Sequence, residues 1–366
     1  MRKFEVPCQV ALVLQGGGAL GAYQVGVYQA LHEAGVEPDW VIGTSIGAIN
    51  GAIIAGNPPE RRLERLDEFW RLVRSRPATG LWGLWPTALS ALSNASIVTQ
   101  GVEGFFQPNR DAAWGMHVPL GVERAAFYST APLRATLERL IDLECLNARR
   151  TRLTLGAVNV STSEMRYFDS RDMPLGVDHV MASGALPPAF PAVRIDGDPY
   201  WDGGVYSNTP MEVVLDDKPR RDALIFAANV WHPTGPEPET IWQVLGRHKD
   251  IQYASRARSH VLRQQQIHRL RHIIRELAQH IPERERSGEA VNKLLAYGCA
   301  TVMHVVPLHA PRLEGEDHTK DIDFTPSGIE ARRQAGYADT LRSLEEEPWA
   351  HATDTMDGVI IHGATP

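Results

Sequence analysis

Two short glycine-containing motifs lie where a predicted strand turns into a predicted helix. They are Gln15-Gly-Gly-Gly-Ala-Leu-Gly21 and Gly43-Thr-Ser-Ile-Gly47. The second fits G-x-S-x-G, the pattern of a nucleophile elbow, in which the glycines allow a sharp turn that exposes the hydroxyl of Ser45. The first places backbone N–H groups at a helix start, where they have no partner within the helix and can bind an oxyanion. Acyl transfer needs both parts close together.

Each motif also has a simpler interpretation. The first satisfies G-x-G-x-x-G, but a dinucleotide fold needs an acidic residue at the end of the second strand, and the nearest acid, Asp39, comes before that strand. Ser45 could merely cap the helix that follows it. The pair of motifs favours acyl transfer over either alternative.

A serine nucleophile also needs a base. Histidine is the usual base, in the order Ser, Asp or Glu, His, but α/β-hydrolases place the elbow after several strands, whereas here it ends the second strand. A carboxylate is the alternative, and Asp202, followed by Gly203 and Gly204, is a candidate. Taken alone, this Asp-Gly pair is more typical of an ordinary hairpin turn.

The elements around the motifs alternate between strand and helix. A short apolar run, Val10–Leu14, precedes a helix over 22–34, and a second strand over 39–42 precedes a helix over 46–55. Short connections of this kind predict a parallel sheet with helices on both faces. Further segments are predicted as strands over 152–160, 223–230 and 301–306, as one or two long helices over 239–281, and as a helix from a Ser327–Glu330 capping box to about 344.

Composition bounds the remaining possibilities. The chain has 366 residues, a net charge of −7, 43% hydrophobic and 22% charged residues, which excludes a disordered chain and a dedicated nucleic-acid binder. Three scattered cysteines form no CxxC pair, which favours a reducing compartment. No stretch predicts a membrane span or an export signal, so we expect a cytoplasmic protein.

The predicted long helix carries two weaker signals. His268 and His272 share one face, but the local sequence does not fit a zinc motif, so we expect them on a solvated surface and expect no metal ion. Ile267, Leu270, Ile274, Leu277 and Ile281 follow 3-4 spacing in a basic stretch. This stripe favours packing on the body or a second subunit, and the alternative is contact with a membrane surface. The apolar segment Leu81–Trp85 could form a lid or part of the core.

Four ordered motifs resemble those of the patatin-like phospholipases. These are the two glycine motifs, the block Ala182-Ser-Gly-Ala-Leu-Pro-Pro-Ala-Phe-Pro191, and Asp202-Gly-Gly204. The surroundings of Gly336–Asp339 are similar to the extra C-terminal region of a bacterial subgroup. One departure is Leu20, where the family often has a basic residue that would suit a phosphate head group.

The resemblance implies a three-layer α/β/α fold with a mostly parallel central sheet and helical C-terminal additions. It implies Ser45 as the nucleophile and Asp202 as the base, with no cofactor. The glycines implied in the oxyanion hole are Gly16, Gly17 and Gly18, and those that support the motifs are Gly21, Gly43, Gly47, Gly203 and Gly204. The recognisable chemistry ends at Gly204.

The expected organisation is a catalytic core over 1–235, a helical insertion, late strand and C-terminal helix packed on it over 236–348, and a loose tail over 349–366. The expected activity is hydrolysis of acyl-lipid esters. The alternatives are a general esterase, thioesterase or acyltransferase, or a non-catalytic lipid- or acyl-binding module. Peripheral membrane contact and a homo-oligomer stay open, and no nucleic-acid partner is expected.

Overall fold

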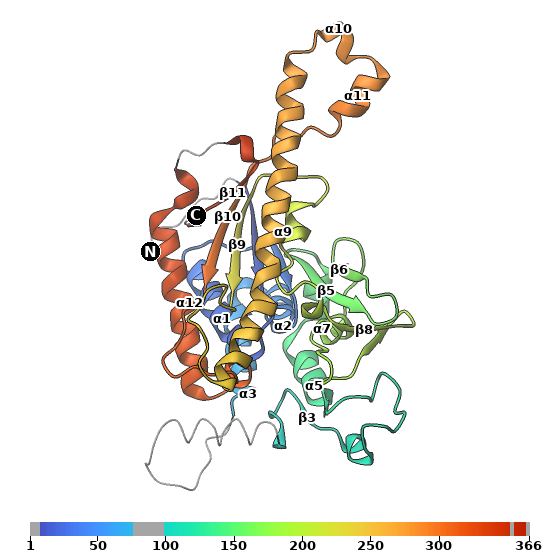
Figure 1. Ribbon diagram of the computed structural model, residues 1–366, viewed down its shortest axis with the longest axis vertical. Helices are drawn as coiled ribbons and strands as arrows, with labels where there is room; N and C mark the ends of the chain where they lie inside the picture. The colour runs from blue at the N-terminus through green and yellow to red at the C-terminus, as the bar shows by residue number, and fades with distance from the viewer. Residues whose placement is uncertain (1–7, 76–98, 352–354, 364–366) are drawn as a thin grey trace.

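A mostly parallel sheet forms the centre of the protein (Figure 1). The computed structural model describes residues 8–75, 99–351 and 355–363, so Leu81–Trp85 lies outside the described residues. Within them the main sheet has nine strands in the order β11-β10-β9-β1-β2-β5-β8-β7, with β6 paired to β5. The bounds are β1 Gln9–Leu14, β2 Trp40–Gly43, β5 Arg152–Asn159, β6 Met165–Asp169, β7 Val193–Ile195, β8 Asp198–Asp202, β9 Ala223–Asn229, β10 Met303–His309 and β11 Val359–Ile361.

Six neighbouring strands, from β11 to β5, run parallel, and β6, β7 and β8 are antiparallel. Helices cover both faces, which confirms the expected fold class. The helices are α1 Ala22–Glu33, α2 Ile46–Ala55, α3 Pro59–Leu72, α5 Ala131–Leu140, α6 Leu143–Asn147, α7 Val177–Ser183, α8 Met211–Leu215, α9 Ile241–Gln279, α10 Glu283–Arg286, α11 Glu289–Leu295 and α12 Pro326–Glu346. A small hairpin of β3 (Gln107–Pro108) and β4 (Tyr128–Ser129) lies apart from the main sheet.

Strand β1 is buried on both faces, because alternate side chains of a strand point to opposite sides of a sheet. Val10, Leu12 and Leu14 belong to the core that includes α1, α2 and α3. Ala11 and Val13 belong to the second core, to which α8 contributes. Because both faces of β1 are buried, every residue from Val10 to Leu14 is apolar.

The C-terminal part is joined to the same sheet. Strand β10 pairs with β9, and β11 pairs with β10. The expected loose tail over 349–366 is therefore wrong for β11, whose Val359 is 0% exposed. A strand of three residues has too short a pattern to be read from sequence, and its stability comes from pairing with β10.

Helix α12 crosses α1 at close range. A Cβ atom on Gly336 would lie 2.0 Å from the carbonyl oxygen of Tyr23, so only glycine allows this approach. The helix begins two residues earlier than the predicted capping box. Thr325 is its N-cap, accepting from the Gly328 N–H at 3.1 Å, so Ser327 lies inside the helix.

Helix α9 is a single helix of 39 residues that continues past the sheet towards α10 and α11 (Figure 1). The predicted solvated position of its histidines is wrong. His268 and His272 are 0% and 7% exposed, and their Nε2 atoms contact the carbonyl oxygens of Leu215 and Thr301 at 2.7 and 2.9 Å.

The apolar stripe of α9 packs on the body only in part. Leu270 and Leu277 are each 60% exposed, whereas Ile267, Ile274 and Ile281 are partly buried. Because residues in a helix are spaced 100° apart, Leu270 lies almost opposite the buried His268. The polar face is thus the one that meets the sheet. Among the described residues, no helix is both long and apolar enough to cross a membrane.

Candidate active site

Three adjacent parallel strands bring the site together. β9, β1 and β2 are neighbours, so their carboxyl ends lie at one edge of the sheet. The chain leaves these ends through Trp231, Gly16 and Ser45 respectively. In open α/β sheets this edge is the usual place for a ligand.

Ser45 occupies a strained turn between β2 and α2. Its backbone angles are φ 58° and ψ −125°, which a residue with a side chain rarely adopts. Gly47 makes the turn fit, since a Cβ atom there would lie 2.2 Å from the carbonyl oxygen of Leu14. No side-chain cap joins Ser45 to α2, so the hydroxyl is not used as a simple N-cap.

The Ala182–Pro191 block supports Ser45 and Asp202 together. The N–H of Ser45 donates to the carbonyl oxygen of Ser183 at 3.0 Å and to its hydroxyl at 3.2 Å. The Ser183 hydroxyl in turn donates to the Gly156 carbonyl at 2.7 Å. The Asp202 N–H donates to the Ala185 carbonyl at 2.9 Å. This segment therefore holds the ends of β2 and β8 in one arrangement.

Asp202 lies at the end of β8, 1% exposed, and lines the same pocket as Ser45. Its Oδ1 accepts from the Gly204 N–H at 2.7 Å, while Oδ2 has no hydrogen-bond partner among the described residues. Burial raises the pKa of the carboxyl from 3.8 to about 7, and the Ser45 hydroxyl and the Gly204 N–H limit that rise. A carboxyl group of this pKa suits a general base near neutral pH.

The glycine loop has fewer unpaired N–H groups than the expected oxyanion hole requires. The Gly16 N–H donates to the carbonyl oxygen of Asn208 at 3.1 Å, so Gly16 is wrong as a donor. Gly17 and Gly18 precede and begin a short 3₁₀ helix (Gly18–Gly21), and their N–H groups have no acceptor among the described residues. Gly18 has φ +56°, and a Cβ atom there would lie 2.2 Å from the carbonyl oxygen of Asp321.

The supporting glycines have steric roles. A Cβ atom on Gly21 would lie 2.5 Å from the Ile46 side chain, and one on Gly43 would lie 2.3 Å from the Gly47 carbonyl. One on Gly203 would lie 2.5 Å from a backbone carbonyl of β5. At all three positions, segments that carry the site approach each other too closely for a side chain.

Two residues of the site were missed in the sequence. The side chain of Asn208 donates to the Gly16 carbonyl at 3.0 Å, and the indole of Trp231 donates to the same oxygen at 2.7 Å. Trp231 follows the carboxyl end of a predicted buried strand, which is a signal for a site residue. Asn208 has no comparable local signal.

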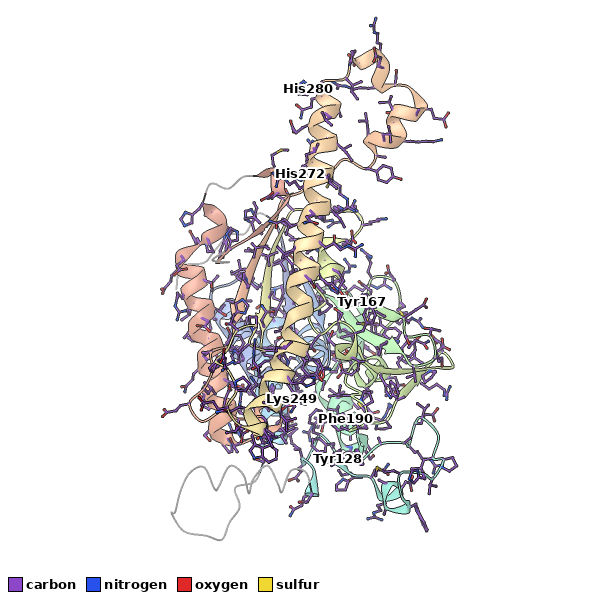
Figure 2. All side chains as sticks on the ribbon, in the orientation of Figure 1. Tyr128, Tyr167, Phe190, Lys249, His272 and His280 are labelled. Atoms are coloured by element: carbon purple, nitrogen blue, oxygen red, sulfur yellow. The ribbon has the colours of Figure 1, made fainter. Side chains whose placement is uncertain are left out.

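An apolar cavity of about 170 Å³ adjoins Ser45 and Asp202. Figure 2 shows Tyr128 and Phe190 near each other, by the end of α9 that carries Lys249. The rings form a connected cluster, with Phe106 4.9 Å from Tyr128 and 5.3 Å from Phe190 between centroids. Other large apolar side chains of the wall include Phe105, Ile322 and Phe324.

Residues after Gly204, which carry none of the four motifs, form part of the cavity wall. Asp321, Ile322 and Phe324 come from the loop between β10 and α12, and Tyr253 comes from α9. The C-terminal third thus completes the pocket. Across the described ranges, no group of three or more His, Cys, Asp or Glu side chains is placed to hold a metal ion.

Comparison with known proteins adds an independent line of evidence. A sequence model of patatin-like phospholipases matches residues 12–215, and a second one, of patatin phospholipases, matches residues 251–356. A patatin-like phospholipase domain-containing protein of Caenorhabditis elegans is 28% identical over 206 residues, which are 56% of this chain and 12% of that protein. A lysophospholipase of Aspergillus terreus is 63% identical over 46 residues, 13% of this chain and 3% of the relative.

The chain thus spans a small fraction of the length of these relatives. Among solved structures, VipD from Legionella pneumophila is similar over 97% of this chain and 72% of its own, at 15% identity and a TM-score of 0.43. The first sequence model covers more than half of the 366 residues and contains all four motifs. The chain therefore belongs to the patatin-like phospholipase family.

Proposed function

We propose that the protein hydrolyses carboxylic esters of acyl lipids, with Ser45 as the nucleophile and Asp202 as the base. The observation that carries this proposal is a buried carboxyl group of pKa about 7 beside a strained serine, at the wall of an apolar cavity. The Ser45 hydroxyl is also the one side chain that acts to lower the pKa of this carboxyl, which agrees with a direct interaction between the two groups.

The reaction proceeds in two halves. Ionised Asp202 takes the proton of the Ser45 hydroxyl as its oxygen attacks the ester carbonyl, and the N–H groups of Gly17 and Gly18 stabilise the oxyanion. Asp202 then gives the proton to the leaving alcohol, which leaves Ser45 acylated. In the second half Asp202 takes a proton from water, the hydroxide attacks the acyl group, and the proton returns to Ser45.

The cavity supports an acyl chain as the group bound beside the nucleophile. Its wall is largely aromatic and aliphatic, and burial of each methylene contributes about 0.8 kcal/mol to binding. Two relatives carry the names phospholipase and lysophospholipase, which agrees with a lipid ester. Leu20 is 4% exposed and packs in the core, so this position offers no cation for a phosphate group.

The test compares matched variants on a p-nitrophenyl ester. Ser45→Ala and Asp202→Asn should each abolish hydrolysis while circular dichroism and unfolding show a folded protein. A fluorophosphonate probe should label the wild type and leave Ser45→Ala unlabelled. Full activity in either variant would exclude the dyad, and an unlabelled wild type would favour a non-catalytic acyl-binding module.

A second assay separates substrate classes. Phospholipid, lysophospholipid, short ester and acyl thioester are compared by kcat/KM at one pH. A preference for lipid esters supports the proposal, whereas a preference for the short ester or thioester assigns the same dyad to a general esterase or thioesterase.

We also propose that the pocket meets its substrate at a membrane surface. Trp114 and Met116 are 76% and 87% exposed, and they lie in a loop whose ends pair beside the pocket residue Tyr128. Exposed tryptophan suits the interface between water and lipid. The fraction of protein that sediments with phospholipid vesicles should fall in the double variant Trp114→Ser, Met116→Ser. It should stay unchanged in Leu294→Ser, which alters a residue of α11 that is 65% exposed. Equal binding by all three proteins would refute this contact.

A further inference from the structure

We infer that Trp231 and Asn208 are positioning residues that fix the oxyanion-binding N–H group of Gly17. The inference rests on the proposed serine-ester chemistry. Both side chains donate to one acceptor, the carbonyl oxygen of Gly16, at 2.7 and 3.0 Å. A carbonyl oxygen has two lone pairs, and two side-chain donors on it together constrain the direction in which it points.

The direction of this carbonyl determines the direction of the neighbouring donor. The Gly16 carbonyl and the Gly17 N–H belong to one planar trans peptide unit and point to opposite sides of it. Glycines on both sides of that unit let it rotate with little steric resistance. The two bonds to Gly16 therefore turn the Gly17 N–H away from Asn208 and Trp231. The loop adjoins the nucleophile, since a Cβ atom on Gly16 would lie 3.0 Å from the Cβ atom of Ser45.

Asn208 is fixed between the two catalytic loops. Its backbone oxygen accepts from the Gly16 N–H at 3.1 Å, so the residue contacts both polar groups of Gly16. Its Oδ1 fills the space left by two motif glycines, lying 2.3 Å from the Cβ position of Gly16 and 2.8 Å from that of Gly204. The absence of side chains at these glycines thus makes room for the amide. Asn208 is 6% exposed, so water does not compete for its bonds.

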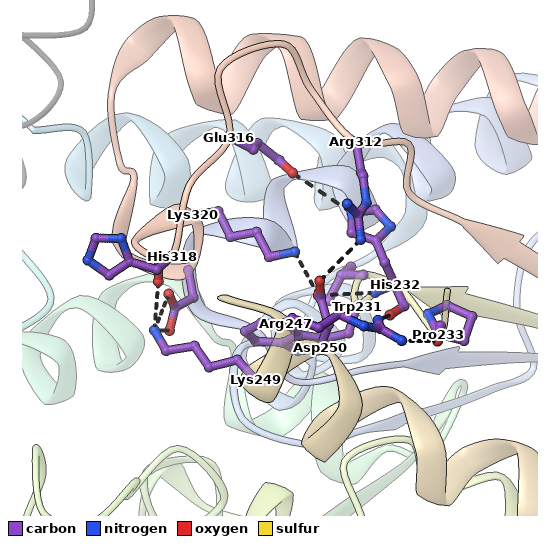
Figure 3. Close-up of polar contacts among 12 residues, drawn as sticks. Trp231, His232, Pro233, Arg247, Lys249, Asp250, Arg312, Glu316, His318 and Lys320 are labelled. Carbon is purple, nitrogen blue, oxygen red and sulfur yellow. Dashed lines mark hydrogen bonds and ion pairs between the residues drawn. The ribbon is translucent and has the colours of Figure 1, made fainter. Parts of the chain in front are cut away.

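Trp231 is held by residues of the sheet and of the C-terminal third. The backbone N–H of Trp231 donates to Oε1 of the buried Gln15 at 3.1 Å. Its ring lies 4.9 Å from the ring of Tyr253 in α9, and the Lys320 ammonium lies 5.3 Å from its centre. Lys320 pairs with the buried Asp250 at 2.7 Å, as Figure 3 shows. The C-terminal third therefore acts on the reaction through the indole.

The experiment removes each donor in turn. Trp231→Phe keeps an aromatic ring and loses the indole N–H, and Asn208→Ala loses the amide. Each should lower kcat on a p-nitrophenyl ester about tenfold and leave KM within about twofold, because the oxyanion contact forms only in the transition state. A trifluoromethyl ketone with the same acyl chain adds the Ser45 oxygen to its carbonyl and forms an oxyanion. Its inhibition constant should rise by the same factor.

The matched control is Trp40→Phe. The Trp40 indole, 0% exposed, donates to the Thr154 hydroxyl at 2.8 Å and has no contact with Gly16. This variant loses a buried hydrogen bond and should keep the wild-type kcat and inhibition constant, although its unfolding midpoint falls. A purely structural role of Trp231 would lower the unfolding midpoint in the same way and leave both kinetic constants unchanged.

Two results would overturn the inference. The first is that the wild type is active and that Trp231→Phe and Asn208→Ala both have the same kcat as the wild type. The other is a lower kcat with an unchanged inhibition constant for the ketone. Since Ser45→Ala tests the ester chemistry itself, loss of that chemistry is distinguished from loss of the positioning role. If one variant does not fold, the other provides the same measurement.

Discussion

Asp202 links the chemistry of the site to the stability of the fold, and the Asp202→Asn substitution separates the two. The carboxyl group has an ordinary pKa of 3.8, whereas burial raises it to about 7 in the folded protein. Between these values the unfolded state binds fewer protons than the folded state, so the free energy of unfolding falls as the pH rises. This contribution is fully present below pH 3.8 and is lost as the pH rises through about 7.

The size of the effect follows from the same two values. The interval from 3.8 to about 7 spans about three pH units, at about 1.4 kcal/mol each, so ionised Asp202 costs the fold about 4 kcal/mol. Asparagine keeps an oxygen that can accept from the Gly204 N–H and carries no charge. Asp202→Asn should therefore raise the free energy of unfolding by up to about 4 kcal/mol near pH 8 and change it little near pH 4.

Urea unfolding of wild type and variant, from about pH 4 to about pH 9, measures this difference. Asp217→Asn is a control of opposite sign. Although burial acts to raise it, the pKa of Asp217 is lowered by hydrogen bonds and ion pairs with Arg152 and Arg171. Asp217→Asn should destabilise the protein by a nearly constant amount from about pH 5 to about pH 9, because the stabilisation from a lowered pKa is lost only as the pH falls below about 4. A difference between Asp202→Asn and wild type that does not change with pH would refute the reasoning, as would a wild-type kcat/KM that does not rise through about pH 7.

Three further substitutions test the site and its support. Gly18→Ala should lower kcat by about 100-fold, because φ is +56° and the new Cβ would lie 2.2 Å from a carbonyl oxygen; wild-type kcat would contradict this. Phe190→Ala should reduce kcat/KM for a long-chain ester about tenfold more than for a short one, and equal losses would exclude its ring from the acyl site. Lys320→Met removes the closest cation from the buried Asp250 and leaves Arg312 at 3.5 Å, so it should cost up to about 3 kcal/mol in urea unfolding. Lys293→Met, 75% exposed, should cost less than about 0.5 kcal/mol, and similar losses in both would refute the distinction.

Much of the N-terminal half followed from local pattern. The helix over 46–55 has the predicted bounds, and the strand ending at Leu14 was found within one residue. These elements are specified by short-range information, namely apolar runs, glycines at turns and helix ends. The motifs at Ser45 and Asp202 could be found for the same reason, since each is a few residues long. Nothing local, however, showed that the two side chains line one pocket.

The C-terminal part was less predictable. The stripe of Leu270 and Leu277 follows a core pattern, yet tertiary packing buries His268 on the opposite face. The histidine is tolerated there because a backbone carbonyl contacts its ring nitrogen. Strand β11 was missed because three residues hold no period of their own.

The sequence by itself determined the class of fold, the nucleophile elbow and the glycine loop, because these depend on residues next to each other in the chain. Only the tertiary structure decided which groups meet in the site. It pairs the Gly16 N–H with Asn208, brings Trp231 onto the Gly16 carbonyl, and places Asp321 and Phe324 in the wall of the pocket. It also raises the pKa of Asp202 to about 7. Burial and hydrogen bonding depend on residues far apart in sequence, so they exist only once the sheet has assembled.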